Sequence, residues 1–400
     1  MNSAFYLAIR SLWWHRGRSL AVIFSLAVIL WLPATLRISL NQFRSDISAR
    51  ADATPLIIGA PGSRIDLVMH GLYFRSQPAA PVTMAEQGLA AEVTGITAIP
   101  LHVRFTTRSQ PGVDGAPIIG TTPEYYTFRQ LTPQAGELPA LLGECVLGAD
   151  YAERSGLRAG DTILSAPRNA LDLAGDYPLQ MLITGVLART FSPDDDAVFT
   201  DLRTAWVIEG IGHGHQTVDQ TTDSSLLLQN SRDGAAAVTA GIGVLPYLEI
   251  TDENRDSFHF HGEPATFPLT AILAVPGSER DRLRLLGRFS GSRQLQCITP
   301  SQVIAELLSI VFRIEQLVLL FTLIAATAAL LLLALVINLS LKLRAAEMQT
   351  MFRLGCSRLT ILCLQSAEVL LLLLIASGLA LIGGLLIRGS VAAMLQRLLL

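Results

Sequence analysis

Lysine is almost missing from this sequence of 400 residues, in which lysine and arginine together number 30. The only lysine is Lys342, and it lies between Leu341 and Leu343. A phosphate-binding loop of the Walker A type needs a Gly-Lys-Ser/Thr core, because its backbone amides and its lysine hold the phosphates. The sequence therefore has no such loop, and any ATP-driven work must draw on an ATPase in another chain.

Charged and aromatic residues are also scarce, at 16% and 6% of the chain, whereas a soluble domain contains about 25% charged residues. The net charge is −3, and no basic stripe is interleaved with aromatic side chains, which excludes the usual kinds of nucleic-acid-binding protein. The GxSxG pattern of a nucleophilic serine is missing, and no paired carboxylates stand out. The sequence therefore predicts no enzyme active site.

The four cysteines form no CxxC pair of the kind that indicates a redox or zinc motif. They are Cys145, Cys297, Cys356 and Cys363. Buried, unpaired thiols are the expected state. A disulfide between Cys145 and Cys297 is the alternative in an oxidising compartment, although the sequence alone does not place the two side by side.

Hydrophobic residues make up 50% of the sequence, and their excess is concentrated in three blocks. Each block reaches the roughly 20 apolar residues that a helix needs to cross a bilayer. We expect transmembrane helices at 19–40, 314–341 and 359–387. Residues 1–18 contain Trp13 and Trp14 and suit an amphipathic interfacial helix that leads into an uncleaved first span, rather than a cleaved signal peptide.

Arginine and lysine in the short flanks set the orientation of these helices. Residues 1–18 contain three arginines and no acid, and the loop 342–358 contains four basic residues and one acid. Both flanks are therefore expected in the cytoplasm. Residues 41–313 would then form a large extracytoplasmic domain, and the tail 388–400 would end on the same side of the membrane.

The extracytoplasmic segment mixes short β-like runs with turn clusters rich in Gly, Pro and Asp, which is typical of an α+β domain. Strands are expected at 55–59, 116–120, 180–187 and 270–275, and a helix at 148–157. Thr299, Pro300 and Gln302 form the start signal of another helix. That helix is predicted to continue as a stalk into the second span, either as a plain connector or as a rod that carries movement across the membrane.

The segment that joins the second and third spans has the sequence RAAEMQTMFRLGCSRLTILCLQSAE. It resembles the Arg-x-x-Glu…Leu-Arg-x-Leu-Gly-x-x-Arg…Glu signature of FtsX/MacB-type ABC permeases, the mechanotransmission class. Two external stretches, GELPALLGECVLGADYAERSGLRAGDTI and LITGVLARTFSPDDDAVFTDL, are similar to the MacB-type periplasmic core. The N-terminal AIRSLWWHRGRSLAVIFSLAV is similar to that family's entry into its first span. The resemblance covers nearly the whole chain.

This resemblance implies a protein of the bacterial inner membrane whose large α+β extracytoplasmic domain is of the MacB-like periplasmic core type, and the apolar blocks add three transmembrane α-helices. Family members have four spans, whereas three are expected here. The resemblance also implies a homodimeric, non-catalytic permease subunit. A separate ABC ATPase, which carries the ATP and Mg²⁺, would dock on the coupling segment 342–358, and a periplasmic binding or adaptor protein is a further expected partner, beside membrane lipid.

The implied function is to couple ATP hydrolysis on that ATPase to movements of the periplasmic domain. Metal handling, and export or extraction of a periplasmic substrate, are the uses that fit. The alternative is an FtsX-like signalling subunit that activates a periplasmic partner protein without transport. The chain also resembles the permease subunits found with zinc-regulated ABC systems, a subgroup of the family.

The coupling segment is predicted to form a short amphipathic helix that ends at Gly355 and could enter an ATPase groove; the alternative is an ordinary charged hairpin. The positions that match the family signature are Arg344, Glu347, Arg353, Gly355, Arg358 and Glu368. The first five are expected to serve ATPase coupling, together with Met351 and Phe352 from the hydrophobic side of the short helix. Glu368 lies within the third span, where an ionisable group costs a few kcal/mol. It is expected to face a polar partner such as Asn338 or Gln365, or to serve packing or coupling.

Four of the seven histidines occur as two pairs, His213-Gly-His215 and His259-Phe-His261. In a strand, residues i and i+2 project from the same face, so two such pairs brought together would offer four imidazoles to a zinc ion. The alternative is a surface coincidence of two unrelated pairs. Asp194, Asp195 and Asp196 resemble a turn of the family's external domain, and we expect them to form a solvated acidic turn.

Overall fold

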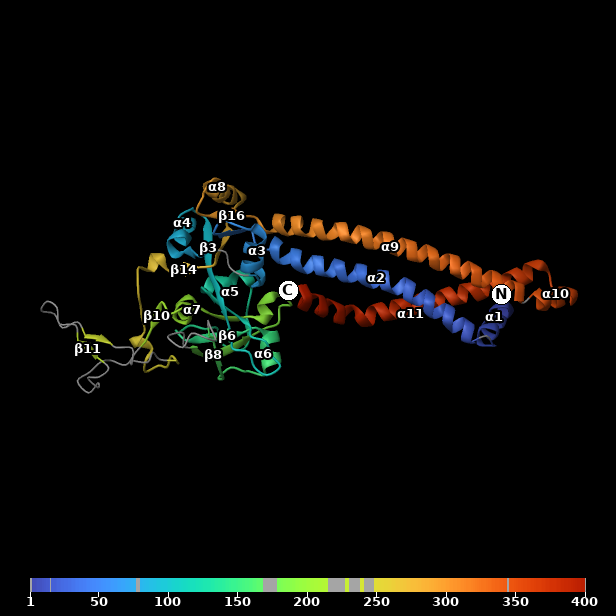
Figure 1. Ribbon diagram of the computed structural model, residues 1–400, viewed down its shortest axis with the longest axis horizontal. Coiled ribbons are helices and arrows are strands. Elements are labelled where there is room, and N and C mark those ends of the chain that lie inside the picture. Colours follow the sequence, from blue (N-terminus) through green and yellow to red (C-terminus); the bar gives the residue numbers. More distant parts are fainter. Residues whose placement is uncertain are drawn as a thin grey trace. The chain divides into compact units, whose positions relative to one another are not determined.

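The computed structural model describes residues 2–14, 16–76, 80–167, 178–214, 227–229, 238–240, 248–343 and 345–399. The chain divides into two compact units. Met1–Ile47 and Glu306–Leu400 form the first unit, and Ser48–Ala305 form the second. The boundary between the units falls within two long helices, α2 (Arg16–Asp52) and α9 (Pro300–Leu343), which are labelled in Figure 1.

A ten-stranded mixed sheet forms the centre of the second unit (Figure 1). Its strands are β1 (Leu56–Gly59), β3 (Ile96–Thr106), β4 (Pro117–Thr121), β5 (Pro133–Gly136), β6 (Glu144–Leu147), β7 (Thr162–Leu164), β8 (Gln180–Leu187), β9 (Val198–Asp201), β15 (Ala271–Pro276) and β16 (Gln296–Ile298). The order is β16-β1-β15-β3-β4-β9-β6-β8-β5, and β7 pairs with β8. The pairs β4–β9 and β6–β8 are parallel and the others antiparallel. All four strands expected from the sequence are present.

Three two-stranded ribbons accompany this sheet among the described residues. They are β2 (Val82–Thr83) with β14 (Pro268–Leu269), β10 (Gly212–His213) with β13 (His259–Phe260), and β11 (Leu227–Gln229) with β12 (Val238–Ala240). In the second ribbon His213 lies directly opposite His259. The antiparallel pairing therefore brings together residues that are far apart in the sequence.

Two clusters of buried apolar side chains form the core of the second unit. One lies along β6 and β8 and includes Leu147 and Ile183. The other lies along β1 and β15 and includes Ile58 and Ile272. Phe260 packs against both clusters. The two clusters are thus separate hydrophobic cores that both contact the Phe260 ring. Fully burying each such apolar side chain stabilises the fold by about 1.5–3 kcal/mol.

Short helices cover the sheet and start with ordinary capping signals. They are α3 (Arg64–Tyr73), α4 (Met84–Ala91), α5 (Pro123–Arg129), α6 (Ala149–Ser155), α7 (Leu202–Ile208) and α8 (Glu279–Phe289). The side chains of Ser63, Asp201 and Ser278 accept hydrogen bonds from backbone N–H groups in the first turns of α3, α7 and α8, respectively. Helix α6 ends at Gly156 with a φ of 72°, a left-handed conformation that glycine adopts without strain. The helix expected at 148–157 is therefore confirmed.

The first unit consists of helices. Besides its parts of α2 and α9, it contains α1 (Asn2–Trp14), α10 (Ala345–Arg353) and α11 (Arg358–Leu399). Leu26 and Ala27 of α2 pack against Ala376 of α11. A Cβ added to Gly383 of α11 would lie 3.1 Å from the indole nitrogen of Trp31, so the small residue lets the two helices approach closely. Helix α9 starts at Pro300, as the start signal predicted.

One helical segment in the described part of the chain is long and apolar enough to cross a membrane, Arg358–Gly384. Two shorter apolar segments, Ser19–Trp31 and Leu319–Ala328, lie in α2 and α9. The third predicted span thus coincides with a helix of sufficient length. The count of three spans stays a prediction, as does the orientation of the N-terminus.

The alternative of a disulfide between Cys145 and Cys297 is wrong, because both thiols are free. Cys145 is on β6 and Cys297 on β16, and five strands lie between them in the sheet. At a spacing of about 4.8 Å per strand, the two are several times farther apart than the roughly 6 Å between Cα atoms that a disulfide spans. Burial raises the pKa of the Cys145 thiol, and it raises that of Cys297 to about 12, so neither is a reactive thiolate.

Candidate functional site

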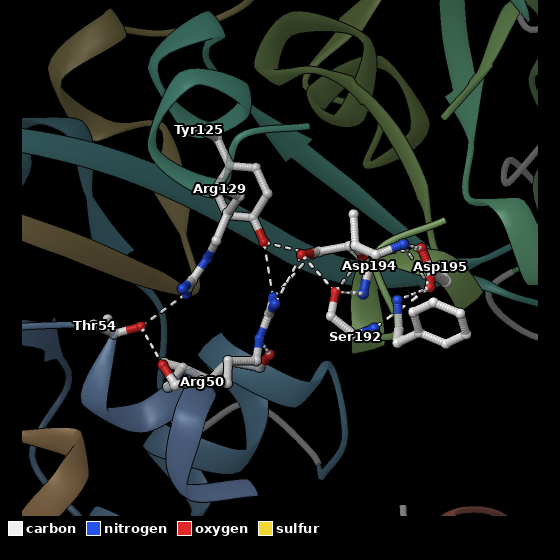
Figure 2. A network of polar contacts seen from close by, with 10 residues as sticks. Arg50, Thr54, Tyr125, Arg129, Ser192, Asp194 and Asp195 are labelled. Atoms are coloured by element: carbon white, nitrogen blue, oxygen red, sulfur yellow. Dashed lines mark hydrogen bonds and ion pairs between the residues drawn. The ribbon is translucent and has the colours of Figure 1, made fainter. Parts of the chain in front are cut away.

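The second unit contains a buried ion pair between Arg50 and Asp194, whose side chains are 6% and 2% exposed (Figure 2). Arg50 belongs to the last turn of α2. Its Nη1 and Nη2 donate to Oδ2 and Oδ1 of Asp194 at 2.7 and 2.9 Å, and its Nε donates to the Leu72 carbonyl. The planar guanidinium matches a carboxylate with two parallel bonds, which defines orientation as well as distance. The end of α2 is therefore held in one position in the domain.

Tyr125 completes this contact from α5 (Figure 2). Its hydroxyl accepts a hydrogen bond from Arg50 Nη2 at 3.0 Å and donates one to Asp194 Oδ1 at 2.8 Å. The side chain is fully buried. Burial first, and then the Asp194 charge, raise the pKa of Tyr125 far above its usual value, so the hydroxyl keeps the proton that it donates. Three elements that are separate in the sequence thus share one closed set of bonds.

Asp194 remains ionised at this buried position. Burial by itself would raise the pKa of Asp194, but the charge and the hydrogen bonds of Arg50 outweigh burial and hold the pKa below its usual range. The same neighbours raise the pKa of Arg50 against the opposing effect of burial. A carboxyl whose folded-state pKa is depressed stabilises the fold above its unfolded-state pKa, and that contribution is lost as pH falls through the folded value. The ion pair is therefore intact at neutral pH.

Asp194 is presented by a 3₁₀ turn, Pro193–Asp196, which we call the acidic turn. Ser192 caps it, and the Ser192 hydroxyl also donates to Asp194 Oδ2 at 3.1 Å. The Asp195 carboxylate accepts the backbone N–H groups of Thr190, at 2.9 Å, and Phe191, at 2.6 Å. Through these bonds Asp195 fixes the backbone of residues 190–191 next to the acidic turn, which helps to hold Asp194 in place.

Gly148 explains how the acidic turn comes so close to α6. A Cβ at this position would lie 2.3 Å from the carbonyl oxygen of Asp194, a distance that backbone atoms cannot tolerate. The Gly148 N–H donates to the Ala197 carbonyl at 2.8 Å. Glycine is therefore required here by the close approach of two backbones rather than by its φ angle.

A second arginine, Arg129, extends the network to Thr54, just after the end of α2. Arg129 Nη2 donates to the Thr54 hydroxyl at 2.9 Å, and that hydroxyl donates to the Arg50 carbonyl at 2.9 Å (Figure 2). Burial, and then the charge of Arg50, lower the pKa of Arg129. Its guanidinium carbon lies 4.7 Å from the centre of the Phe128 ring, which stabilises a cation at a site with little water.

The interpretation of Asp194–Asp196 as a solvated acidic turn is wrong for two of the three residues. Asp194 and Asp195 are each 2% exposed, and only Asp196, at 39%, faces solvent, where it pairs with Arg154 and Arg75. The residue that buries Asp194 is Arg50, 144 positions earlier. No local pattern marks that partner, because the arginine lies at the end of an apolar helix among other charged residues.

The coupling segment forms the short helix that the sequence predicts. Helix α10 ends at Arg353, and Gly355 follows with a φ of 92°. The Phe352 side chain is 52% exposed, and the Arg358 guanidinium lies 5.8 Å from the centre of its ring. Met351 is half-buried, Arg353 is exposed, the side chain of Glu347 is not described, and Arg344 lies outside the described residues. That these residues contact an ATPase stays a prediction.

The structure describes Glu368 and three of the four histidines that the sequence singled out. Glu368 is half-buried on α11, ten positions after the first residue of that helix, and its role in packing or coupling stays a prediction. His213, His259 and His261 come together so that one nitrogen of each lies within 4.8 Å of the others. His215 lies outside the described residues.

A cavity of about 390 Å³ lies beside the sheet and is lined by two buried histidines, His70 and His102. His102 Nε2 is 2.9 Å from an oxygen of Glu209. The Nδ1–H of His70 points to the Ser76 carbonyl at 3.4 Å. Burial lowers the pKa of His70 to about 4. Sequence patterns missed this pair, because single histidines carry no spacing signal.

The buried His70 predicts an acid-sensitive fold. Because the unfolded chain binds this proton near pH 6.5 and the folded chain only near pH 4, stability should fall by about 3 kcal/mol as pH drops through that window. Urea unfolding of the detergent-solubilised chain at pH 7 and pH 4.5 would measure most of this loss. In the His70→Gln variant, which has a neutral side chain at both pH values, the loss should be smaller by that amount. An unchanged loss in the variant would assign the effect to other groups.

A family model described as MacB-like periplasmic core domain matches residues 19–240, which include Arg50, Tyr125 and Asp194. No curated protein matches. The extracellular domain of the noncanonic ABC-type transporter YknZ from Gram-positive bacteria is similar at 12% identity and a TM-score of 0.34, over 61% of this chain and 98% of that one. The periplasmic region of MacB from Actinobacillus actinomycetemcomitans is similar at 11% identity and a TM-score of 0.35, over 64% and 92%.

Proposed function

The chain belongs to the MacB-like periplasmic core domain family, and we propose that it is the permease subunit of a mechanotransmission ABC complex in a bacterial inner membrane. Its N-terminus and its coupling segment lie in the cytoplasm, and its second unit lies in the periplasm. A separate ABC ATPase supplies the ATP-driven movement. Two copies of the chain form the working dimer.

The observation that carries this proposal is the buried attachment of α2 by Arg50. A helix of 37 residues is about 55 Å long, well beyond the roughly 30 Å of a bilayer's hydrocarbon core. Arg50 ties the last turn of this helix to the acidic turn and to α5 through charge-assisted bonds in a buried site. Helix α2 is continuous from Arg16 to Asp52 with Pro33 in its interior, and a helix is stiff along its axis. A displacement of the part that follows Pro33 is therefore passed to the acidic turn.

Helix α9 supplies the return connection. It has 44 residues, about 66 Å in length, and continues without interruption from Pro300 to Leu343, so it ends at the second residue of the coupling segment 342–358. Its first turn is in the second unit, where Val303 and Ile304 are buried. Both ends of the domain sequence thus pass into long helices, which is what a device for transmitting movement requires.

Because the sequence contains no phosphate-binding loop, ATP is bound by another chain in this proposal. The α10 helix offers that chain an exposed aromatic ring at Phe352, beside the cation of Arg358. A short amphipathic helix of this kind inserts into a groove of a partner by its apolar side. ATP binding on two ATPase copies would draw the cytoplasmic ends of the dimer together, and α2 and α9 would pass this movement to the periplasmic domains.

The proposal is tested by co-purification and by coupled hydrolysis. The chain, extracted from its native membranes in mild detergent, should carry an ABC ATPase identified by its Walker A peptide. Reconstitution of the two in lipid vesicles should raise ATP hydrolysis several-fold above that of the ATPase alone. A chain that is extracted in folded form without any ABC ATPase, and that leaves hydrolysis by candidate ATPases unchanged, would contradict the proposal.

The second candidate function is signalling, in which the movement activates a periplasmic partner protein and nothing is transported. The buried Arg50–Asp194 ion pair serves this function equally well, because it transmits movement whatever the output is. Substrate accumulation across vesicles that contain the complex distinguishes the two. ATP-dependent accumulation assigns transport, and activation of a periplasmic partner without accumulation assigns signalling.

A further inference from the structure

Three histidines lie on or directly beside two short paired strands, His213 on β10, His259 on β13 and His261 just after β13. Around β10 the sequence is Gly212-His213-Gly214, and around β13 it is Phe258-His259-Phe260-His261. Alternate residues of a strand project from the same face. The pairing of His213 with His259, continued by a bond from the His261 N–H to the Ile211 carbonyl at 3.0 Å, places the three histidines on one face of the ribbon.

The other face of the ribbon is formed by two glycines and two phenylalanines. A Cβ on Gly212 would lie 2.6 Å from the Phe260 ring, and a Cβ on Gly214 would lie 2.6 Å from the Phe258 ring. The rings therefore lie directly on the glycine backbone. Phe258 is 7% exposed and belongs to the core of the β6–β8 end of the sheet. Because the core holds the phenylalanine face, the histidine face is directed away from it.

The three imidazoles form a nearly equilateral triangle. The distances between their ring centres are 4.8 Å for His213–His259, 4.8 Å for His213–His261 and 4.9 Å for His259–His261. Three imidazoles bound tetrahedrally to one Zn²⁺ at about 2.0–2.1 Å place their ring centres about 5 Å apart. The spacing of the ring centres thus matches a shared metal ion. Rotation of the imidazoles about their side-chain bonds, without movement of either strand, would bring the ligand nitrogens from within 4.8 Å of one another to the roughly 3.4 Å of a tetrahedral Zn²⁺ site.

We propose that His213, His259 and His261 form a binding site for one divalent transition metal ion, with Zn²⁺ as the best match. Imidazole nitrogens suit Zn²⁺ and its neighbours, whereas Mg²⁺ and Ca²⁺ require oxygen ligands. His259 Nδ1 is 3.1 Å from the Ser257 carbonyl, so a proton on Nδ1 is donated to that oxygen, and Nε2 of the neutral imidazole then carries the lone pair that a metal ion would take. Three protein ligands leave a fourth position for water or another ligand.

This site goes beyond the proposed function and does not depend on it. His259 and His261 lie after residue 240, where the match to the family model ends. The ion would link β10, which follows α7, to β13. In the sequence, 45 residues lie between His213 and His259. A bound metal ion stabilises the conformation in which the three imidazoles lie together. The gain in free energy grows with the logarithm of the ratio of metal concentration to dissociation constant.

The test is a zinc titration of the full chain in detergent, purified with a tag that contains no histidine and freed of metal with a chelator. Competition with a chromogenic zinc indicator should show one tight site per chain, with no binding of Mg²⁺. Replacement of even an outer contact of a metal site weakens affinity about 10–100-fold, so His213→Ala and His259→Ala should each weaken it about 100-fold or more. Asp256→Ala, which removes an exposed carboxylate from the turn before β13, should leave the affinity unchanged.

A conservative variant keeps the test decisive if an alanine variant fails to fold. His213→Cys replaces one zinc ligand with another, so it should retain tight binding that His213→Ala loses. Co²⁺ bound to the unsubstituted chain should show the intense visible absorption of a four-coordinate ion, and the cysteine variant should add a thiolate charge-transfer band. Absence of stoichiometric zinc binding in the folded chain, or unchanged affinity in both alanine variants, would overturn the proposal.

Discussion

Asp194→Ala is expected to destabilise the extracytoplasmic domain by about 3–5 kcal/mol, the usual cost of removing one partner from a buried ion pair. The variant leaves the Arg50 guanidinium buried with one hydrogen-bonding carbonyl and one hydroxyl, and without a counter-charge. Tyr125 loses its acceptor at the same time. Urea unfolding of the detergent-solubilised chain, followed by tryptophan fluorescence from Trp206 in α7, would measure the loss.

Asp196→Ala is the matched control for this prediction. Asp196 lies in the same acidic turn and carries the same charge, but it is 39% exposed and pairs with arginines at the surface. An exposed ion pair contributes about 0–1 kcal/mol, so the control should cost no more than that. Equal losses in the two variants would show that the turn, rather than the buried charge pair, is what matters.

A combined variant separates the charge pair from its surroundings. Arg50→Met, Tyr125→Phe and Asp194→Leu together replace the polar triangle with apolar side chains of similar volume. Such replacements are often neutral or stabilising, because no uncompensated charge remains. We expect this triple variant to be more stable than Asp194→Ala. If it transmits movement poorly while its domain is stable, the ion pair contributes orientation to coupling rather than stability to the fold.

Phe352→Asp is expected to separate the chain from its ATPase. Aromatic side chains that fill a partner's groove carry 2 kcal/mol or more of binding free energy, which corresponds to about 30-fold or more in affinity. An aspartate at this exposed position on α10 removes the ring and adds a charge. Co-purification of the ATPase and stimulated hydrolysis should both be lost, whereas the extracytoplasmic domain should unfold at the same urea concentration as before.

Leu283→Asp is the control for that substitution. Leu283 is an exposed apolar residue, 57% accessible, on α8 in the second unit, so the change adds the same charge to a helix that is not proposed to contact the ATPase. This variant should keep the ATPase. If Phe352→Asp also retains the ATPase and full stimulated hydrolysis, then α10 is not the docking helix.

Local patterns predicted much of the fold because they depend on neighbouring residues. The strands at 180–187 and 270–275 follow from short apolar runs, and the end of α6 at Gly156 follows from a glycine that tolerates a left-handed φ. The alternation of histidine with glycine and phenylalanine predicted one common face for each pair. Register then decided which histidines meet, since His213 pairs with His259 only in the observed antiparallel ribbon.

Long apolar segments, arginine-rich flanks, the lack of a phosphate-binding loop and an α+β extracytoplasmic domain all follow from the sequence alone, because each depends on composition or on residues close together in the chain, and the MacB-like type of that domain follows from resemblance to the family. The burial of Asp194 and the separation of Cys145 from Cys297 became evident from the folded chain. The physical reason is the same in both cases. The sheet order brings the end of α2 to the acidic turn across 144 residues and separates β6 from β16, and no local pattern encodes that order.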